Sequence, residues 1–249
     1  MPLLELRDVT KSYDSFNVVD HFDLSVEPGE LRCLLGPNGA GKTTSIDLIT
    51  GRQRLTSGRI VFDGEDITHW REHQRARAGI GRKFQVPAVF KDLTVFENFE
   101  VASSRQTNPF KNMARFTDRL DRTRFEEVIE MVGLRHRLAD RAGNLSHGET
   151  QWLEIGMVLC QGPRLLLMDE PTAGMTELET KKTGEIFKML RGTHTLIVVE
   201  HDMSFVRDIA DVITVMHMGH TLAEGRITDI ETNSTVKEVY LGRGGISHA

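Results

Sequence analysis

Eight residues near the N-terminus constrain the fold of this chain more than any other feature. Residues 36–43 read Gly-Pro-Asn-Gly-Ala-Gly-Lys-Thr and fit the pattern G-x-x-x-x-G-K-[ST]. A short apolar run, Leu31–Leu35, precedes them, and a helical stretch, Thr44–Ile49, follows. Glycines let a backbone wrap closely around phosphate oxygens, and the start of a helix favours negative charge. The pattern in this context therefore predicts a strand, a phosphate-binding loop and a helix, in preference to a Gly-rich turn that binds nothing.

The residue types in this loop predict contacts to a nucleotide. Lys42 would place a positive charge on the β- and γ-phosphates, and the Thr43 hydroxyl would be a Mg²⁺ ligand. Inward-pointing backbone N–H groups would supply further contacts. The predicted nucleotide-binding residues of this segment are Gly36, Pro37, Asn38, Gly39, Ala40, Gly41, Lys42, Thr43 and Thr44. The loop alone does not separate a transport ATPase from a kinase or a GTPase.

The distribution of apolar residues predicts an α/β fold. Leu165–Met168 and Leu196–Val199 are continuous apolar runs, and such runs suit strands buried on both faces of a parallel sheet. Apolar and polar residues alternate near Leu4 and over Phe22–Val26, which is typical of half-buried strands. We therefore expect a parallel sheet in the core and an antiparallel β-subdomain formed by the N-terminal residues.

The periodicity becomes helical in the middle of the chain. Thr94 and Glu97 have the spacing of a capping box, and apolar residues follow at helical intervals. We expect a single domain over residues 1–249 in which an α-helical subdomain is inserted into the α/β core. The core comprises 1–85 and 163–249, and the helical subdomain comprises 86–162.

Polar residues follow two of the apolar runs directly. Asp169 and Glu170 come after Leu165–Met168, and His201 lies just beyond Leu196–Val199. Ligands gather at the carboxyl ends of strands in an open parallel sheet. Asp169 would lie near Mg²⁺, and Glu170 would hold a water beside the γ-phosphate. A helix N-terminus that favours acidic residues is the alternative explanation for the two carboxylates, and a lone histidine is more often structural.

A second capping box opens a helix at Leu-Ser-His-Gly-Glu, residues 145–149. Ser146 and Glu149 have the required spacing, and Trp152 and Ile155 continue one apolar face. One interpretation is simply a well-capped helix. The other is that this N-terminus presents free N–H groups and the Ser146 hydroxyl to an anion.

Composition argues against several other classes of protein. The chain has 31 Lys plus Arg against 36 Asp plus Glu, a net charge of -5, whereas nucleic-acid-binding domains usually carry a basic excess. The apolar runs are far shorter than the roughly 18–20 residues that cross a bilayer. The two cysteines, Cys33 and Cys160, do not make a disulfide framework. We expect a protein of a reducing compartment that is not secreted and does not bind nucleic acid.

Taken together, these segments resemble the ATP-binding subunits of ABC transporters over essentially the whole chain. Segment 36–43 matches the Walker A motif, and 165–170 matches Walker B with its following glutamate. Segment 145–149 stands in the place of the LSGGQ signature. Further matches are Tyr13 to the aromatic that stacks on adenine, Gln85 to the Q-loop glutamine and His201 to the switch histidine.

The resemblance implies a RecA-like P-loop core that uses ATP and Mg²⁺. It implies a catalytic set of Glu170, His201 and Gln85, and Mg²⁺ ligands from Thr43, Gln85 and Asp169. It also implies that the signature residues reach the ATP held by a partner subunit. These are Ser146, His147, Gly148 and Glu149.

The signature departs from the family pattern at two positions. His147 replaces the first glycine, and Glu149 replaces the final glutamine. A carboxylate aimed at a γ-phosphate would be repulsive, so we expect Glu149 to turn back onto its own helix cap, as glutamate does in a capping box. We therefore expect the signature to function. Any effect of the bulky His147 side chain is expected on the closure of the two subunits that ATP drives.

Shorter segments resemble the urea-uptake members of the branched-chain amino acid importer group. They include Arg82–Gln85, Leu93–Asn98, Trp152–Met157 and Pro171–Thr176. The resemblance implies a subunit that powers urea import, peripheral on the cytoplasmic face of the inner membrane. Its partners would be two permease subunits, a second ATPase subunit (a paralogue or another copy of this chain) and, indirectly, an external solute-binding protein.

Several alternatives remain open from the sequence. The solute could be a branched-chain amino acid or a short amide. In a different class, the chain could be a soluble ABC ATPase with no role in transport, although such proteins usually carry two ATPase halves, coiled-coil arms or zinc modules. An exporter ATPase differs by its partner and not by its hydrolytic site. A P-loop kinase would lack Gln85, the signature helix and His201 in this order.

Overall fold

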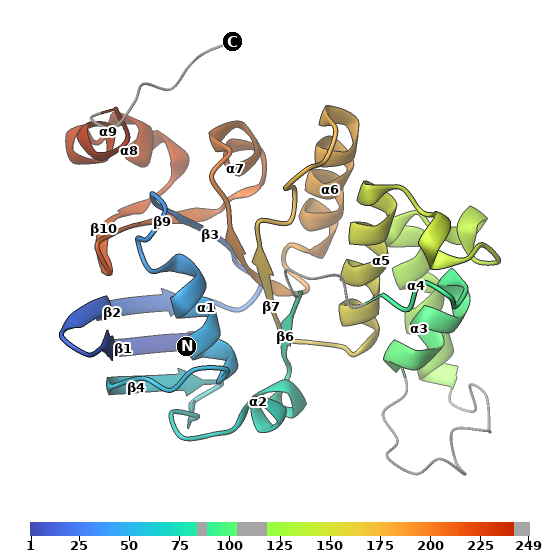
Figure 1. Ribbon diagram of the computed structural model, residues 1–249, viewed down its shortest axis with the longest axis horizontal. Coiled ribbons are helices and arrows are strands. Elements are labelled where there is room, and N and C mark those ends of the chain that lie inside the picture. Colours follow the sequence, from blue (N-terminus) through green and yellow to red (C-terminus); the bar gives the residue numbers. More distant parts are fainter. Residues whose placement is uncertain (84–88, 104–118, 242–249) are drawn as a thin grey trace.

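The computed structural model describes residues 1–83, 89–103 and 119–241, and the description below refers to these residues. A six-stranded sheet forms the centre of the molecule (Figure 1). Its strand order is β10-β9-β3-β8-β7-β6, and every neighbouring pair is parallel except the hairpin of β9 and β10. The strands are β3 (Leu31–Leu35), β6 (Ile80–Arg82), β7 (Leu165–Asp169), β8 (Thr195–Val199), β9 (Val212–His217) and β10 (His220–Gly225).

The three apolar runs of the sequence form the central strands β3, β8 and β7, and every residue in them is buried. Alternate residues serve the two faces of the sheet. Cys33 and Met168 pack with α5 (His147–Cys160), α6 (Glu177–Leu190) and α7 (Met203–Ile209), whereas Leu34 and Leu167 pack with α1 (Lys42–Thr50) and the second sheet. This two-sided burial explains why the runs do not alternate with polar residues.

The second sheet is antiparallel and is built from the N-terminal residues, as predicted. Its order is β2-β1-β4-β5. The strands are β1 (Leu4–Tyr13), β2 (Phe16–Val26), β4 (Ser57–Phe62) and β5 (Glu65–Asp66). Helix α1 lies between this sheet and the central sheet, so the two sheets share one apolar core.

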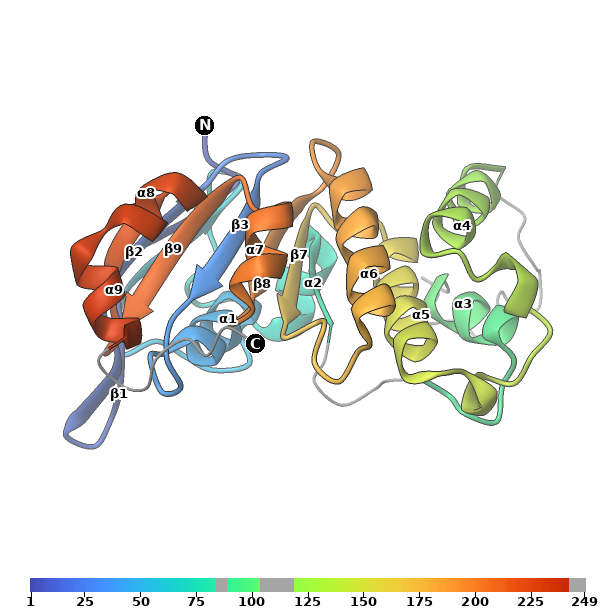
Figure 2. The same ribbon diagram turned by 90° about the horizontal axis from the view of Figure 1, so that it is seen from above.

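Helices α3 (Val95–Ser103), α4 (Arg119–Val132) and α5 (His147–Cys160) gather at one end of the molecule, beyond β6 and β7 (Figures 1 and 2). The predicted capping box opens α3: Thr94 N–H donates to Glu97 Oε2 at 2.7 Å, and Glu97 N–H donates to Thr94 Oγ1 at 3.2 Å. The Phe125 ring of α4 meets Phe99 of α3 edge-on at 5.8 Å.

The remaining helices are α2 (Glu72–Ala78), which leads into β6, and α8 (Ile227–Thr232) and α9 (Ser234–Leu241), which lie at the opposite end from α3 and α4. In the described parts of the chain, no helix has both the length and the apolar character needed to span a membrane. The α/β fold class predicted from the sequence is confirmed by this arrangement of sheets and helices.

Candidate nucleotide-binding site

The predicted phosphate loop connects the carboxyl end of β3 to the first turn of α1. The two ends of the loop are mostly buried, and its middle is exposed. Buried residues are Gly36, Ala40, Gly41 and Lys42; exposed residues are Asn38, Gly39 and Thr43; Pro37 and Thr44 are intermediate. A Cβ at Gly36 would lie 2.3 Å from the carbonyl oxygen of Met216 in β9. The loop starts so close to the neighbouring strand that only glycine fits there.

Lys42 is held by the loop itself. Its Nζ donates to the carbonyl oxygens of Gly36 at 2.6 Å and Pro37 at 3.1 Å. Burial lowers the pKa of Lys42, while the nearby carboxylates of Glu170 and Asp169 act in the opposite direction. The ammonium group is therefore fixed over the loop, where it can neutralise an anion that the loop binds.

Asp169 and Thr43, two of the predicted Mg²⁺ ligands, are in contact. The Thr43 hydroxyl donates to the Asp169 carboxylate, which is buried at the end of β7. Burial raises the pKa of Asp169, and the bond from Thr43 and the charge of Arg82 lower it. A hydroxyl and a carboxylate fit Mg²⁺, which takes oxygen ligands and receives others from substrate phosphates and water. The third predicted ligand, Gln85, lies outside the described residues.

Glu170 follows Asp169 in a strained backbone conformation. Its φ of +46° lies in the left-handed region, which a residue other than glycine adopts at a cost of order 1–3 kcal/mol, and such residues cluster at active sites. Its backbone N–H donates to Val199 O of β8 at 2.9 Å. Its carboxylate is half-exposed and lies 3.9 Å from Nδ1 of His201, which follows β8. The structure thus brings Lys42, Thr43, Asp169, Glu170 and His201 to one edge of the sheet.

Sequence reasoning missed Glu200, which links the loops that carry Glu170 and His201. The Glu200 side chain is buried and accepts from the Thr172 hydroxyl at 2.6 Å and from the His201 backbone N–H at 3.2 Å. The signal for Glu200 in the sequence was the position of an acidic residue directly after an apolar run. Because Glu200 bonds to both loops, it fixes the spacing between Glu170 and His201.

Tyr13 lies apart from these residues. It ends β1, its ring is half-exposed, and Lys11 Nζ lies 4.7 Å from the ring centroid. Its hydroxyl donates to the side-chain oxygen of Gln53, a residue beyond the C-terminal end of α1, whereas the phosphate loop precedes that helix. Stacking of Tyr13 on adenine therefore stays a prediction.

The capping box at the start of α5 has the predicted form. Glu149 N–H donates to Ser146 Oγ at 3.1 Å, and Ser146 N–H donates to Glu149 Oε2 at 2.9 Å. Glu149 also lies 3.4 Å from Arg137 Nε. The expectation that Glu149 turns back onto its own helix cap is confirmed, so its charge is engaged within the helix start.

A second carboxylate reaches the same helix start from α6. Glu179 Oε1 accepts from the Ser146 hydroxyl and from the Gly148 backbone N–H, each at 3.1 Å. Its other oxygen accepts from Thr176 and caps α6 itself. A Cβ at Gly148 would lie 2.4 Å from Glu179 Oε1, so a larger residue at 148 would displace the Glu179 carboxylate from this position. The N-terminus of α5 thus does bind a carboxylate, as its free N–H groups favour.

His147 takes part in a specific contact. Its Nε2 lies 2.9 Å from the carbonyl oxygen of Ala173, in the loop that follows Glu170. Because a carbonyl only accepts, Nε2 carries the proton in this bond. The residue that replaces the family glycine therefore ties the start of α5 to the loop after β7.

We expect His147→Ala to lower the free energy of unfolding by about 1 kcal/mol, the usual net value of one such hydrogen bond. Chemical denaturation would measure the change. His136→Ala is the matched control, since His136 is exposed in the short helix Arg135–Arg137 of the same helical region. Equal destabilisation by both substitutions would contradict the assignment.

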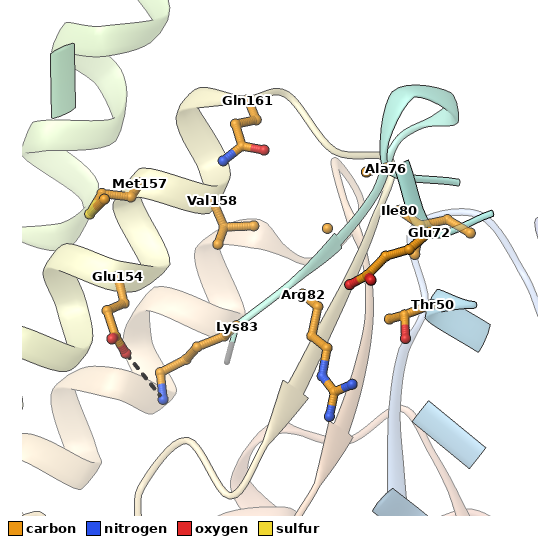
Figure 3. A pocket seen from close by; sticks show the side chains of 11 residues that line it. Thr50, Glu72, Ala76, Ile80, Arg82, Lys83, Glu154, Met157, Val158 and Gln161 are labelled. Atoms are coloured by element: carbon orange, nitrogen blue, oxygen red, sulfur yellow. Dashed lines mark ion pairs between the residues drawn. The ribbon is translucent and has the colours of Figure 1, made fainter. Parts of the chain in front are cut away.

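A pocket of about 180 Å³ lies beside this site, between β6, α2 and α5 (Figure 3). Lys83 and Glu154 form a buried ion pair on one side of it, with Nζ and Oε2 3.6 Å apart. Arg82 lines the pocket from β6, and Val158 and Gln161 line it from α5 and the residue after it. The pocket marks where the central sheet meets the helix whose start carries the predicted signature.

Comparison with known proteins places these observations in a family. Residues 19–173 match the family model described as ABC transporter. The chain is 36% identical over 250 residues to a high-affinity branched-chain amino acid transport ATP-binding protein of Pseudomonas aeruginosa, covering 97% of this chain and 98% of that protein. It is 34% identical to the protein of the same description from Escherichia coli K12, with the same two coverages.

Solved structures give the same result for the fold. An ATP-binding cassette of an ABC transporter in an ADP conformation has a TM-score of 0.84 and 29% identity, covering 97% of this chain and 99% of that chain. A nucleotide-free cassette has a TM-score of 0.82, also at 29% identity.

Proposed function

We propose that this chain, which belongs to the ABC transporter family as an ATP-binding subunit, powers the import of a small polar solute. As a member of this family it binds ATP, hydrolyses it with Mg²⁺ and works with membrane permease subunits. The solute, the number of partners and the role of each site residue are our proposals. The core over 1–85 and 163–249 would hold the nucleotide, and the helical subdomain over 86–162 would carry the signature.

One observation supports the proposed mechanism more than any other. Glu170, whose backbone is strained, and the neighbouring His201 lie beside Asp169 and Thr43, which are in contact with each other. Glu170 orients the attacking water or takes its proton, and His201 supports both Glu170 and the γ-phosphate. Thr43, Asp169 and Gln85 would hold Mg²⁺, which would supply neutralisation of charge on the β- and γ-phosphates. Lys42 adds a fixed positive charge to the same phosphates.

The signature helix acts on a second subunit. The Ser146 hydroxyl and the Gly148 N–H, which donate to Glu179 in this structure, would exchange that carboxylate for the γ-phosphate of the ATP held by the partner subunit. His147 and Glu149 would shape the same helix start. Two such subunits would enclose two ATP molecules, and their association and dissociation would drive the permeases. Gln85 would link the nucleotide state to the helical subdomain.

Urea is the solute that we propose, because the segments around Arg82–Gln85 and Pro171–Thr176 resemble urea-uptake members of this importer group. Branched-chain amino acids are the second candidate, since the relatives named above transport them. The subunit would lie on the cytoplasmic face of the inner membrane, with two permease subunits, a second ATPase and an external solute-binding protein completing the system.

Purification of tagged chain from gently solubilised native membranes tests the transport role. We expect two permease chains and a second ATPase among the companions. Recovery of companions that all lack membrane-spanning segments, at adequate expression, would contradict the proposal and favour an ABC ATPase without a transport role.

The solute is tested on the same complex, reconstituted in vesicles with its binding protein. We expect urea to stimulate ATP hydrolysis and leucine to leave it at the basal rate. Stimulation by leucine and not by urea would instead establish the second candidate. A complex carrying Glu170→Gln gives the background rate of ATP hydrolysis, which is subtracted from the rate measured with each solute.

A further inference from the structure

One buried guanidinium lies between two buried or nearly buried carboxylates in the core. Arg82, the last residue of β6, has a side chain that is 6% exposed. Its Nη1 donates to Oδ1 of Asp47 in α1, and its Nη2 lies 4.0 Å from Oδ2 of Asp169 at the end of β7. Three elements of the nucleotide-binding core therefore meet at this side chain, which has no role in the mechanism given above.

The nearer partner of Arg82 is itself held in place. The second oxygen of Asp47 accepts from the side-chain amide of Gln53 at 3.0 Å, and the Gln53 side-chain oxygen accepts from the Tyr13 hydroxyl. Because both oxygens of Asp47 have donors, its carboxylate has a defined orientation. The guanidinium bound to it is therefore anchored on α1 and not only on its own strand.

The second partner, Asp169, needs such an anchor. Its side chain is almost completely buried, and burying a carboxylate is unfavourable unless it is paired or hydrogen-bonded. Thr43 donates to it, and the charge of Arg82 faces it from the β6 side. A guanidinium is planar and presents donors in fixed directions, so one Arg can restrain two carboxylates at once.

We propose that Arg82 is a positioning residue that holds Asp169 in the orientation used for Mg²⁺, with Asp47 as its anchor. This inference rests on the proposed role of Asp169. Residues behind a metal ligand commonly fix its orientation, and their loss typically lowers metal affinity by about 10–100-fold. Arg82 also comes three residues before Gln85 in the sequence, so the same strand leads to another proposed ligand.

The choice of substitution decides what the test measures. A neutral residue at position 82 would have two effects of opposite sign on Mg²⁺ affinity. Removing the positive charge, which repels Mg²⁺, would raise the affinity, and removing the restraint on Asp169 would lower it. Arg82→Lys keeps the charge, but its single ammonium group lacks the planar fork that faces both Asp47 and Asp169. A changed Mg²⁺ requirement in this variant therefore reports the geometry.

The experiment is a Mg²⁺ titration of the binding of a fluorescent ATP analogue to the full chain, with affinity in EDTA as the reference. We expect Arg82→Lys to raise the Mg²⁺ midpoint about tenfold while the affinity in EDTA stays within about twofold. Arg32→Lys is the matched control, because Arg32 is a buried guanidinium in β3 that also pairs with two carboxylates, Glu30 and Glu224. It should leave the midpoint unchanged.

Asp169→Asn distinguishes failure of this inference from failure of the proposed site. If Asp169→Asn leaves the midpoint unchanged, the proposed Mg²⁺ role of Asp169 is wrong. If it raises the midpoint and Arg82→Lys changes it no more than Arg32→Lys does, only the role of Arg82 is overturned. If Arg82→Lys does not fold, Asp47→Asn tests the same proposal. We expect Asp47→Asn to raise the Mg²⁺ midpoint a few-fold, and a midpoint equal to that of the wild type would overturn the proposal that Asp47 anchors Arg82.

Discussion

Glu170→Gln is expected to slow ATP hydrolysis by about 10²–10⁴-fold and to leave ATP binding in place. The amide has almost the size of the carboxylate but cannot take a proton from water. Glu170 directly follows Asp169 of the proposed Mg²⁺ ligand pair, and its carboxylate lies 3.9 Å from Nδ1 of His201. Glu200 lies 4.0 Å from the same nitrogen, but its side chain is buried and accepts from the Thr172 hydroxyl, whereas the Glu170 carboxylate is half-exposed. The substitution thus removes a proton acceptor from a site that is otherwise intact.

Single-turnover hydrolysis and nucleotide binding, measured on the same preparation, would check this result. Glu177→Gln is the control, because Glu177 is an exposed acid in the first turn of α6 and removing it changes the net charge equally. Hydrolysis by Glu170→Gln within about threefold of the control would show that another group activates the water.

The second large effect concerns stability. Lys83→Met is expected to lower the free energy of unfolding by about 3–5 kcal/mol, because it removes the cation from a buried ion pair. The side chains of Lys83 and Glu154 are 4% and 5% exposed, and the pair joins the end of β6 to α5. Burial lowers the pKa of Lys83, and the charge of Glu154 opposes that shift.

A double substitution separates loss of the pair from loss of packing. Because the penalty in Lys83→Met comes from a carboxylate left buried without this cation, Lys83→Met with Glu154→Met should regain most of the lost stability. Lys188→Met is the control: its pair with Asp208 joins α6 and α7 at the surface and should contribute about 1 kcal/mol or less. Equal losses for Lys83→Met and Lys188→Met in denaturant titrations would rule out the buried-charge explanation.

The features that the sequence predicted depend on residues close together in the chain. The loop at 36–43, the strands ending at Leu35 and Asp169, and the capping box of Ser146 and Glu149 each follow from spacing within a short segment. Local patterns determine dihedral angles and burial, so these elements could be derived from one sequence.

The features that the sequence did not predict join residues far apart. Arg82 and Asp47 are separated by 35 positions, and Glu200 and Thr172 by 28. No periodicity links such pairs, because the first contact depends on how β6 packs against α1 and the second on how β7 pairs with β8. In the sequence, Arg82 belongs to a segment whose only signal is its resemblance to a family. Its two partners, Asp47 and Asp169, are identified only by the three-dimensional structure.

The contact between Gly148 and Glu179 also has an evolutionary consequence. The two residues lie 31 positions apart, yet any side chain at 148 would enter the space of the Glu179 carboxylate. A mutation that enlarges residue 148 would therefore displace the Glu179 side chain and break its bonds to the Ser146 hydroxyl and the residue-148 N–H, whereas a shorter residue at 179 leaves room for the new side chain. In descendants of this sequence, a change at one of these two positions is therefore expected to alter which residues are tolerated at the other.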